Sequence, residues 1–244
     1  MLQAAILLAL FAGSQAAAQS ITAASFEEPT DRYDHGILGD AVEWGALRVL
    51  VTGPGGTGSH TVRLPQPLVF EDVAPRLWDV TGDGAPEVVV VQSSLSRGAR
   101  LLVLGVVEGR LIELAATPFI GERHRWLAPA GAADLDRDGR IEIAYVDRPH
   151  LNRVLRILRM RPGDAGGWSL EEVAAVKGLT NHRIGDPNIS GGLRDCRESR
   201  AIVTASADWT RVLATTYDGT TTETVDLGPN DGPAALAAAL DCEN

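Results

Sequence analysis

Short apolar runs rich in β-branched residues recur along the chain, and several of them directly follow an aspartate-rich loop. Two examples are Val88-Val89-Val90-Val91 and Ile141-Glu142-Ile143-Ala144-Tyr145-Val146. β-Branched and aromatic residues favour strands, and runs of this length fit strands better than helices. Helical periodicity is confined to the first residues and to 234–240. The repeat described next assigns 234–240 to a strand, so we expect an all-β fold.

An aspartate that closes an apolar segment recurs at irregular intervals of about 50 residues. The five positions are Asp40, Asp79, Asp134, Asp195 and Asp241. A second strand-like run follows three of them, at 100–104, 153–158 and 211–215, and a third follows at 111–114, 168–173 and 221–225. Each unit therefore predicts a small antiparallel sheet of three or four strands.

Repeated small sheets are typical of β-propeller blades. Five aspartate positions predict a propeller of about five blades, and four blades with irregular termini is the alternative. The chain ends at Asn244, too early to complete the last blade. We therefore expect residues 21–35 to supply its outer strand and to close the ring, which removes exposed sheet edges.

The loop from Asp134 to Glu142 has the composition of a site for a hard cation. Its carboxylates are Asp134, Asp136, Asp138 and Glu142. Calcium takes six to eight oxygen ligands, mainly carboxylates and carbonyls, and the backbone carbonyl of Arg140 would add one more. The sequence predicts a calcium site here.

A weaker version of the same loop occurs earlier in the chain, with Asp79, Thr81, Asp83 and Glu87 at the corresponding positions. An EF-hand requires a glutamate at the twelfth position and flanking helices. That position is Val90 in the first loop and Tyr145 in the second. The alternative for both loops is that Asp-Gly only makes a hairpin turn, without metal.

The pattern Asp-x-Asp-x-Asp-Gly-x-x-Glu leading into an apolar strand resembles the calcium loops of FG-GAP repeats, also called VCBS repeats. These repeats build the β-propeller of integrin α subunits and of many bacterial secreted proteins. The resemblance covers most of 30–244, although only the two loops carry specific motifs. The family's Phe-Gly dipeptide is replaced by Trp126-Leu127 and Ile184-Gly185. The resemblance implies a calcium-stabilised propeller that binds ligands on the face opposite the calcium loops.

Basic residues recur ahead of the repeat aspartates. His124-Arg125 lies ten residues before Asp134, His182-Arg183 lies thirteen before Asp195, and His35 lies five before Asp40. In a propeller these side chains would gather at one mouth of the central channel and bind an anion such as a carboxylate or sulfate. Because histidine titrates near neutral pH, we expect anion affinity to rise as the pH falls from about 7.5 to 5.5. Structural caps at blade corners are the alternative.

The first residues read as a secretory signal peptide. Residues 2–12 are apolar, Ala16-Ala17-Ala18 fits a cleavage site, and the segment is too short to span a membrane. The usual basic start is missing, because no lysine or arginine precedes Arg32; a buried N-terminal helix is the alternative. We therefore expect a signal peptide at 1–18 and a single domain at 19–244.

Charge and cysteine content agree with export to the periplasm or the cell exterior. The net charge of −10 argues against nucleic-acid partners, which require basic surface. The two cysteines, Cys196 and Cys242, each follow a repeat aspartate. Equivalent positions of neighbouring blades lie near each other, so we expect one disulfide, as in an oxidising compartment.

Two functions follow from these observations. The first is a monomeric, calcium-stabilised binding or scaffold module whose partner is a protein or a small anionic ligand. The alternative is a periplasmic enzyme of lyase or hydrolase type that works at the channel mouth. Its candidate residues would be His124, Arg125, His182, Arg183 and Asp186. The chain has no Gly-x-Ser-x-Gly and no His-Glu-x-x-His motif, so catalysis is the less favoured reading.

Overall fold

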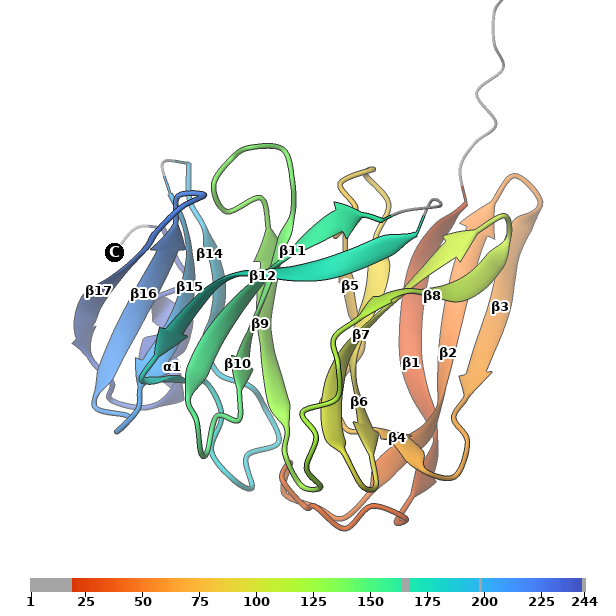
Figure 1. Ribbon diagram of the computed structural model, residues 1–244, viewed down its shortest axis with the longest axis horizontal. Helices are drawn as coiled ribbons and strands as arrows, with labels where there is room; N and C mark the ends of the chain where they lie inside the picture. Colours follow the sequence, from red (N-terminus) through yellow and green to blue (C-terminus); the bar gives the residue numbers. More distant parts are fainter. Residues whose placement is uncertain (1–18, 164–166, 198, 243–244) are drawn as a thin grey trace, which may run out of the picture.

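Antiparallel strands build nearly the whole fold, as the apolar pattern predicts (Figure 1). The computed structural model describes residues 19–163, 167–197 and 199–242. The elements are β1 (Ser20–Thr30), β2 (Glu43–Gly53), β3 (Gly56–Arg63), β4 (Leu68–Phe70), β5 (Arg76–Trp78), β6 (Glu87–Ser94), β7 (Gly98–Val107), β8 (Arg110–Ala116), β9 (Leu127–Ala133), β10 (Glu142–Asp147), β11 (Val154–Pro162), β12 (Trp168–Lys177), β13 (Leu179–Thr180), β14 (Gly192–Asp195), β15 (Arg200–Ser206), β16 (Arg211–Tyr217), β17 (Thr222–Pro229) and α1 (Pro233–Ala238).

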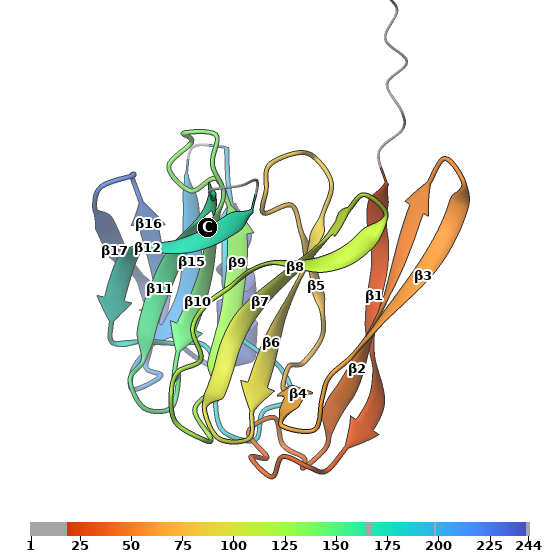
Figure 2. The same cartoon turned by 45° about the vertical axis from the view of Figure 1, so that its right-hand side comes forward.

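The strands form three hydrogen-bonded sheets, and none of these closes on itself. The first sheet joins two units, β1–β3 and β5–β8, through the short strand β4, which pairs with both β2 and β6. The second sheet is β12-β11-β10-β9, and the third contains β13 to β17. In Figures 1 and 2 the units follow one another side by side along the molecule.

Neighbouring units pack face to face through their central strands. All eight residues of β6 are buried because both of its faces are covered. Val88 and Val90 pack with Leu47 of β2, in one core cluster. The alternate residues Val89 and Val91 belong to the next cluster, between the first and second sheets. The period of two in a strand explains why a continuous valine run serves two cores at once.

The segment 234–240 is not the strand that the repeat predicts. Most of it lies in the helix α1, with Pro233 at its start and Leu236 buried against the third sheet. Proline at the first helical position has a favourable φ, and alanine has the highest helix propensity. Local propensity therefore outweighs the repeat frame here.

The expected ring closure by residues 21–35 is also wrong. β1 pairs with β2 along its length, from Ser20↔Thr52 to Thr30↔Glu43. Ile21 packs beside Val49 in the core of the first sheet. β17 remains an edge strand paired only with β16 within the described part of the chain. Strands adjacent in sequence usually pair, and the described strands form no fifth unit.

Loops from the two ends of the molecule meet at one end of the strands. The backbone N–H of Gly185 donates to the carbonyl oxygen of Ile37 at 3.0 Å. A β-carbon on Gly39 would lie 2.6 Å from the carbonyl oxygen of Gly185. The loops 31–42 and 181–191, which flank the first and third sheets, therefore touch (Figure 2).

The predicted signal peptide at 1–18 lies outside the described residues. No helix within the described ranges has the length and apolar character needed to cross a membrane.

Candidate functional site

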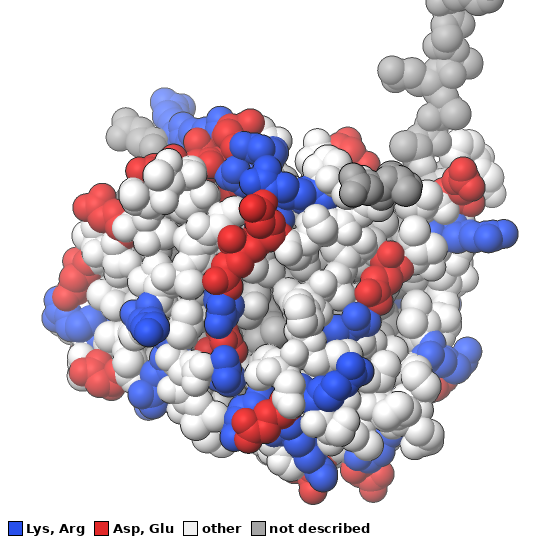
Figure 3. All heavy atoms as spheres, in the orientation of Figure 1, with Lys and Arg blue, Asp and Glu red and all other residues white. Residues whose placement is uncertain are grey.

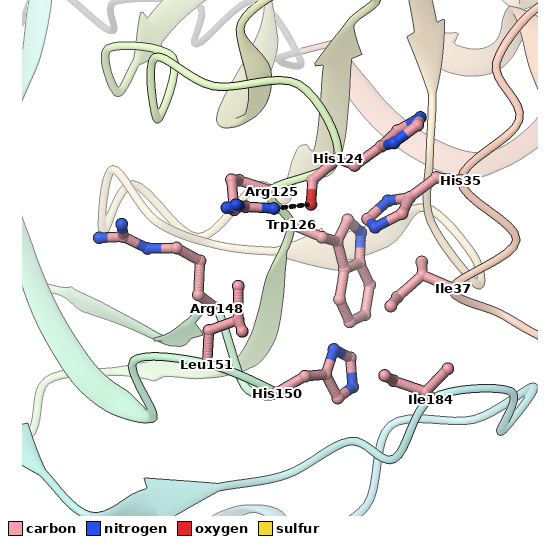
Figure 4. Close-up of a pocket in the computed structure, with 9 residues that line it drawn as sticks. All are labelled: His35, Ile37, His124, Arg125, Trp126, Arg148, His150, Leu151 and Ile184. Carbon is pink, nitrogen blue, oxygen red and sulfur yellow. Dashed lines mark hydrogen bonds between the residues drawn. The ribbon is translucent and has the colours of Figure 1, made fainter.

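A cavity of about 260 Å³ opens where four loops converge, at the end of the sheets opposite the aspartate loops. The loops are 31–42, 117–126, 148–153 and 181–191. Figure 4 shows Trp126 at the centre, His35 and His124 on one side of it, and His150 and Ile184 on the other. The lining residues are His35, Ile37, His124, Arg125, Trp126, Arg148, His150, Leu151 and Ile184.

A buried carboxyl group orients His35. Oε1 of Glu71 lies 2.5 Å from Nδ1 of His35, and the hydroxyl of Ser93 donates to Oε2 of the same carboxyl. Glu71 is fully buried, and this burial raises its pKa to about 8. Burial, and then the positive charge of Arg125, lower the pKa of His35 to about 4. The pair of Glu71 and His35 therefore carries no net charge near neutral pH. The carboxyl contacts Nδ1 of His35, which leaves the second ring nitrogen, Nε2, outside this contact.

A second imidazole stacks on the first. The rings of His35 and His124 are 4.9 Å apart between centroids and nearly parallel, at 13°. The backbone N–H of His124 donates to the buried hydroxyl of Tyr33 at 3.0 Å. Nε2 of His124 lies 2.9 Å from the exposed carboxylate of Asp34. These contacts hold both rings at the wall of the cavity.

Two further histidines form a short hydrogen-bonded chain below Trp126. Nε2 of His150 lies 3.0 Å from Nδ1 of His182, and Nε2 of His182 donates to the backbone oxygen of Asp186 at 2.8 Å. Burial lowers the pKa of both rings, that of His150 to about 4. The ring of His182 packs edge-on against Trp126, with 4.8 Å between the ring centroids, so His182 lies behind the cavity wall.

Two arginines line the cavity, and they pair with different carboxylates, one buried and one exposed. Arg148 makes two hydrogen bonds to the buried carboxylate of Asp147, each of 2.8 Å. Arg125 pairs with Glu122, whose side chain is 65% exposed, and donates to the carbonyl of His124. Exposed ion pairs contribute little stability, so the pairing of Arg125 with Glu122 is weak.

The five ligand residues predicted from the sequence do not share one place. His35, His124 and Arg125 line the cavity, and His182 lies directly behind it. Arg183 does not join them; its guanidinium stacks on Trp209, 4.4 Å from the ring centroid, beside a separate hollow that Asp186 also lines.

Sequence reasoning missed Trp126 as a lining residue, His150, Arg148 and the carboxyl of Glu71. Their separation along the chain gave no common pattern, because each comes from a different loop or strand end. The Trp126 indole also donates to the backbone oxygen of Glu71 at 2.8 Å, which links the two. Only His150 could have been found, as another histidine close to an apolar strand end.

The expected gain in anion affinity between pH 7.5 and 5.5 stays a prediction. It assumed histidines that titrate near neutral pH. The pKa values of His35 and His150 lie near 4 because of burial. Of the predicted histidines, His35 therefore does not gain its charge within that window.

The aspartates of the loop at 134–142 gather as a cation site requires. One carboxylate oxygen each from Asp134, Asp136 and Asp138 lies within 4.8 Å of the others, the one such cluster of three acidic, histidine or cysteine side chains within the described ranges. Asp134 also accepts the backbone N–H groups of Asp138 and Gly139 at 3.0 and 2.9 Å. Gly139 has a φ of +86°, which the tight turn needs.

The guanidinium of Arg159, from β11, also reaches into this loop. It lies 2.6 Å from Oδ2 of Asp136, 3.1 Å from Oδ2 of Asp138 and 2.5 Å from Oε1 of the fully buried Glu142. Arg140 pairs with Asp138 through its side chain. Four carboxylates against two guanidinium groups leave two negative formal charges. The oxygen-rich donor set and this excess both fit one divalent hard cation.

The weaker loop is satisfied by its own backbone. Asp79 accepts the N–H groups of Gly82, Asp83 and Gly84. Glu87 accepts those of Val80 and Thr81 as well as the hydroxyl of Thr81. Asp83 bonds the N–H of Ala85 at 2.8 Å. The loop of Asp134 makes the same kinds of backbone bonds. The difference is Thr81, which stands where the other loop has Asp136, so this loop lacks the middle carboxylate of the cluster.

Cys196 and Cys242 form a disulfide, with Cα atoms 5.5 Å apart. The disulfide links the chain after α1 to the end of β14. Arg137, in the loop of Asp134, donates to the carbonyls of Cys196 and Arg197, so this loop lies beside the disulfide. On the face of the molecule drawn in Figure 3, acidic and basic side chains are interspersed and form no continuous basic patch.

No family model matches this chain, and no curated protein matches it. The resemblance to FG-GAP repeats therefore rests on the loop residues themselves.

Proposed function

We propose that the protein is an exported binding module that takes a small carboxylate in the cavity around Trp126. The observation that carries this proposal is the lining itself. Arg125 stands at the wall of a cavity lined by apolar and imidazole side chains, and its ion pair is with the exposed carboxylate of Glu122. A carboxylate that displaces Glu122 gains a charge-assisted, planar contact with the guanidinium.

The remaining walls favour an apolar body on the ligand. Ile37, Trp126, Leu151 and Ile184 line the cavity, and Leu151 and Ile184 are 58% and 70% exposed. Exposed aliphatic side chains beside a cavity mark a place where an apolar group is covered on binding. A compact ring or branched chain that carries one carboxylate fits this combination.

An acid–base enzyme is the second candidate, and the pairing of Glu71 with His35 favours it. A buried carboxyl that holds one ring nitrogen leaves the other to accept or donate a proton at the cavity. The substrate would again be held by Arg125. Binding without turnover is the simpler reading, because the chain has no Gly-x-Ser-x-Gly and no His-Glu-x-x-His motif.

Calcium in the loop of Asp134 is part of the proposal. Its ligands would come from Asp134, Asp136, Asp138, the carbonyl of Arg140 and Glu142. Support comes from the clustered carboxylate oxygens and from the two uncompensated charges. The loop of Asp79, Thr81, Asp83 and Glu87 would bind more weakly, because Thr81 replaces the middle carboxylate.

The blade interpretation of the sheets also belongs to the proposal. Four strand units pack face to face in sequence order, and their first and last loops meet at Gly39 and Gly185. This arrangement supports a propeller-like arc of four units in place of the five expected. The disulfide supports export, since such bonds persist in oxidising compartments.

Isothermal titration with benzoate tests the function. We expect Arg125→Ala to weaken benzoate binding by about tenfold or more, which is the usual effect of losing a hydrogen bond to a charged group. Arg183→Ala is the matched control, because its guanidinium lies on Trp209 outside the cavity; its affinity should equal that of the wild type. Equal benzoate affinity in Arg125→Ala and wild type would place the site elsewhere.

A further inference from the structure

The buried His182 and the half-buried His150, below Trp126, determine which hydrogen-bonding group the cavity offers. The backbone oxygen of Asp186 can only accept a hydrogen bond. Nε2 of His182 lies 2.8 Å from it and must therefore carry a hydrogen. This assignment needs no assumption about His150.

The state of His182 then follows from its surroundings. The residue is 1% exposed and packs edge-on against Trp126. A charged imidazole there would lose its hydration, and burial accordingly lowers its pKa. With one hydrogen on Nε2 and no charge, its Nδ1 has a lone pair and accepts.

His150 completes the chain. Its Nε2 lies 3.0 Å from Nδ1 of His182, so it donates to that lone pair. Burial is the largest cause of the lowered pKa of His150, and the charges of His182, His35 and Arg153 lower it as well, while a backbone hydrogen bond with His182 raises it. In the resulting neutral tautomer, Nδ1 of His150 keeps its lone pair, and Figure 4 shows the ring directed into the space below Trp126.

We infer that His150 is a specificity-determining hydrogen-bond acceptor, so the cavity selects carboxylates that also carry a hydroxyl or N–H donor. The inference rests on the proposed carboxylate site. Arg125 would hold the carboxylate, Trp126 and Ile184 the apolar body, and Nδ1 of His150 the donor. His182 is a positioning residue, which acts only through the tautomer of His150.

Two probes of nearly equal shape separate this inference from the proposed function. These are 3-hydroxybenzoate, which has a donor, and 3-methylbenzoate, which has none. Titrated into the full chain at pH 7, the wild type should bind the hydroxy compound about tenfold more tightly, the effect of one hydrogen bond to a buried acceptor. His150→Phe keeps a planar ring without a lone pair, and it should bind both probes equally.

The outcomes are distinct. If wild type binds both probes with equal affinity, the specificity inference is wrong while the carboxylate site stands. If it binds neither, both are wrong. If it prefers 3-methylbenzoate, His150 does not accept from the ligand.

A spectroscopic measurement checks the relay without any ligand. Nitrogen-15 shifts of the imidazoles at pH 7 should show Nε2–H and an unprotonated Nδ1 for both His150 and His182. His182→Phe removes the acceptor, so the fixed tautomer of His150 and the tenfold preference should both decline. A protonated Nδ1 on His150 in the wild type would overturn the inference.

Discussion

The side-chain carboxyl group of Glu43 is buried, an environment that disfavours its ionised form. Glu43 starts β2, is 2% exposed, and its Oε2 has no hydrogen-bond partner within the described part of the protein. Burial, followed by the negative field of Glu71, raises its pKa to about 9. A carboxyl that is protonated when folded and ionised when unfolded makes stability depend on pH.

The sign of this dependence is opposite for the buried histidines. Glu43 binds its proton more tightly when folded, so its contribution is complete below pH 4.5 and is lost as the pH rises towards 9. His35 and His150 bind protons less tightly when folded, so they reduce stability only as the pH falls from 6.5 towards 4. Between pH 6.5 and 9 the raised pKa values of Glu43 and Glu71 make stability fall as the pH rises.

Glu43→Gln should therefore flatten the alkaline side of the stability profile. We expect the wild-type melting temperature to fall by several degrees between pH 6.5 and 9. The Gln variant should fall less, because the amide does not ionise. Thermal melts at half-unit pH steps measure this, with the exposed Glu223→Gln as the control. Parallel wild-type and variant curves would show that Glu43 is already ionised when folded.

The loop between β9 and β10 shows how an element combines turn chemistry with long-range charge. Its tight turn is local, made by Gly139 and by the backbone bonds to Asp134. The cation that faces its carboxylates comes from β11, where Arg159 is 17 residues beyond Glu142. Arg159 compensates part of the negative charge, so the loop keeps its shape while an excess of two charges remains.

Asp136→Asn should remove most of the metal response of the protein. A ligand that binds only the folded state stabilises it by mass action, so calcium should raise the wild-type melting temperature by several degrees over a chelator. The Asn variant lacks one anionic oxygen donor of the cluster and should respond little. Asp83→Asn is the control, because Asp83 belongs to the loop outside the cluster.

Scanning fluorimetry with calcium and with chelator provides the comparison. A chelator that leaves the wild-type melting curve unmoved contradicts the calcium assignment. A full response in Asp136→Asn would mean that another site binds the metal.

At the scale of the molecule, one contact between distant loops shapes the cavity. Gly39 and Gly185 are far apart in sequence, yet Gly39 has a φ of +99° and leaves room for the carbonyl of Gly185. This approach holds Ile37 and Ile184 on one side of the cavity. The mouth therefore depends on the packing of every unit between the two loops.

Gly39→Ala should loosen that mouth. A β-carbon would lie 2.6 Å from a backbone oxygen, and the positive φ disfavours any side chain. We expect a melting temperature lower by several degrees and benzoate binding weakened several-fold. Gly55→Ala is the control, because a β-carbon there meets nothing within 4 Å. Normal benzoate affinity in a folded Gly39→Ala variant would exclude the loop contact from site formation.

The sequence alone determined the strands, the aspartate turns and the disulfide pair. Val88-Val89-Val90-Val91 predicts a strand because β-branched residues favour extended backbone, and the structure contains it as part of β6. Asp134 to Glu142 predicts a tight oxygen-rich loop because glycine and aspartate spacing act locally. Such features depend on neighbours within a few residues, which a single sequence displays.

Tertiary structure decided which strands pair and which side chains lie together. The sequence could not pair β1 with β2 in place of a last blade, because both pairings satisfy the same apolar pattern. The sequence predicted Arg183 beside Arg125, whereas in the structure the Arg183 side chain stacks on Trp209. It assigned ordinary titration to the histidines, while burial lowered the pKa of His35 and His182. Charge state, cavity and sheet order arise from contacts between residues far apart in the chain, so only the folded molecule determines them.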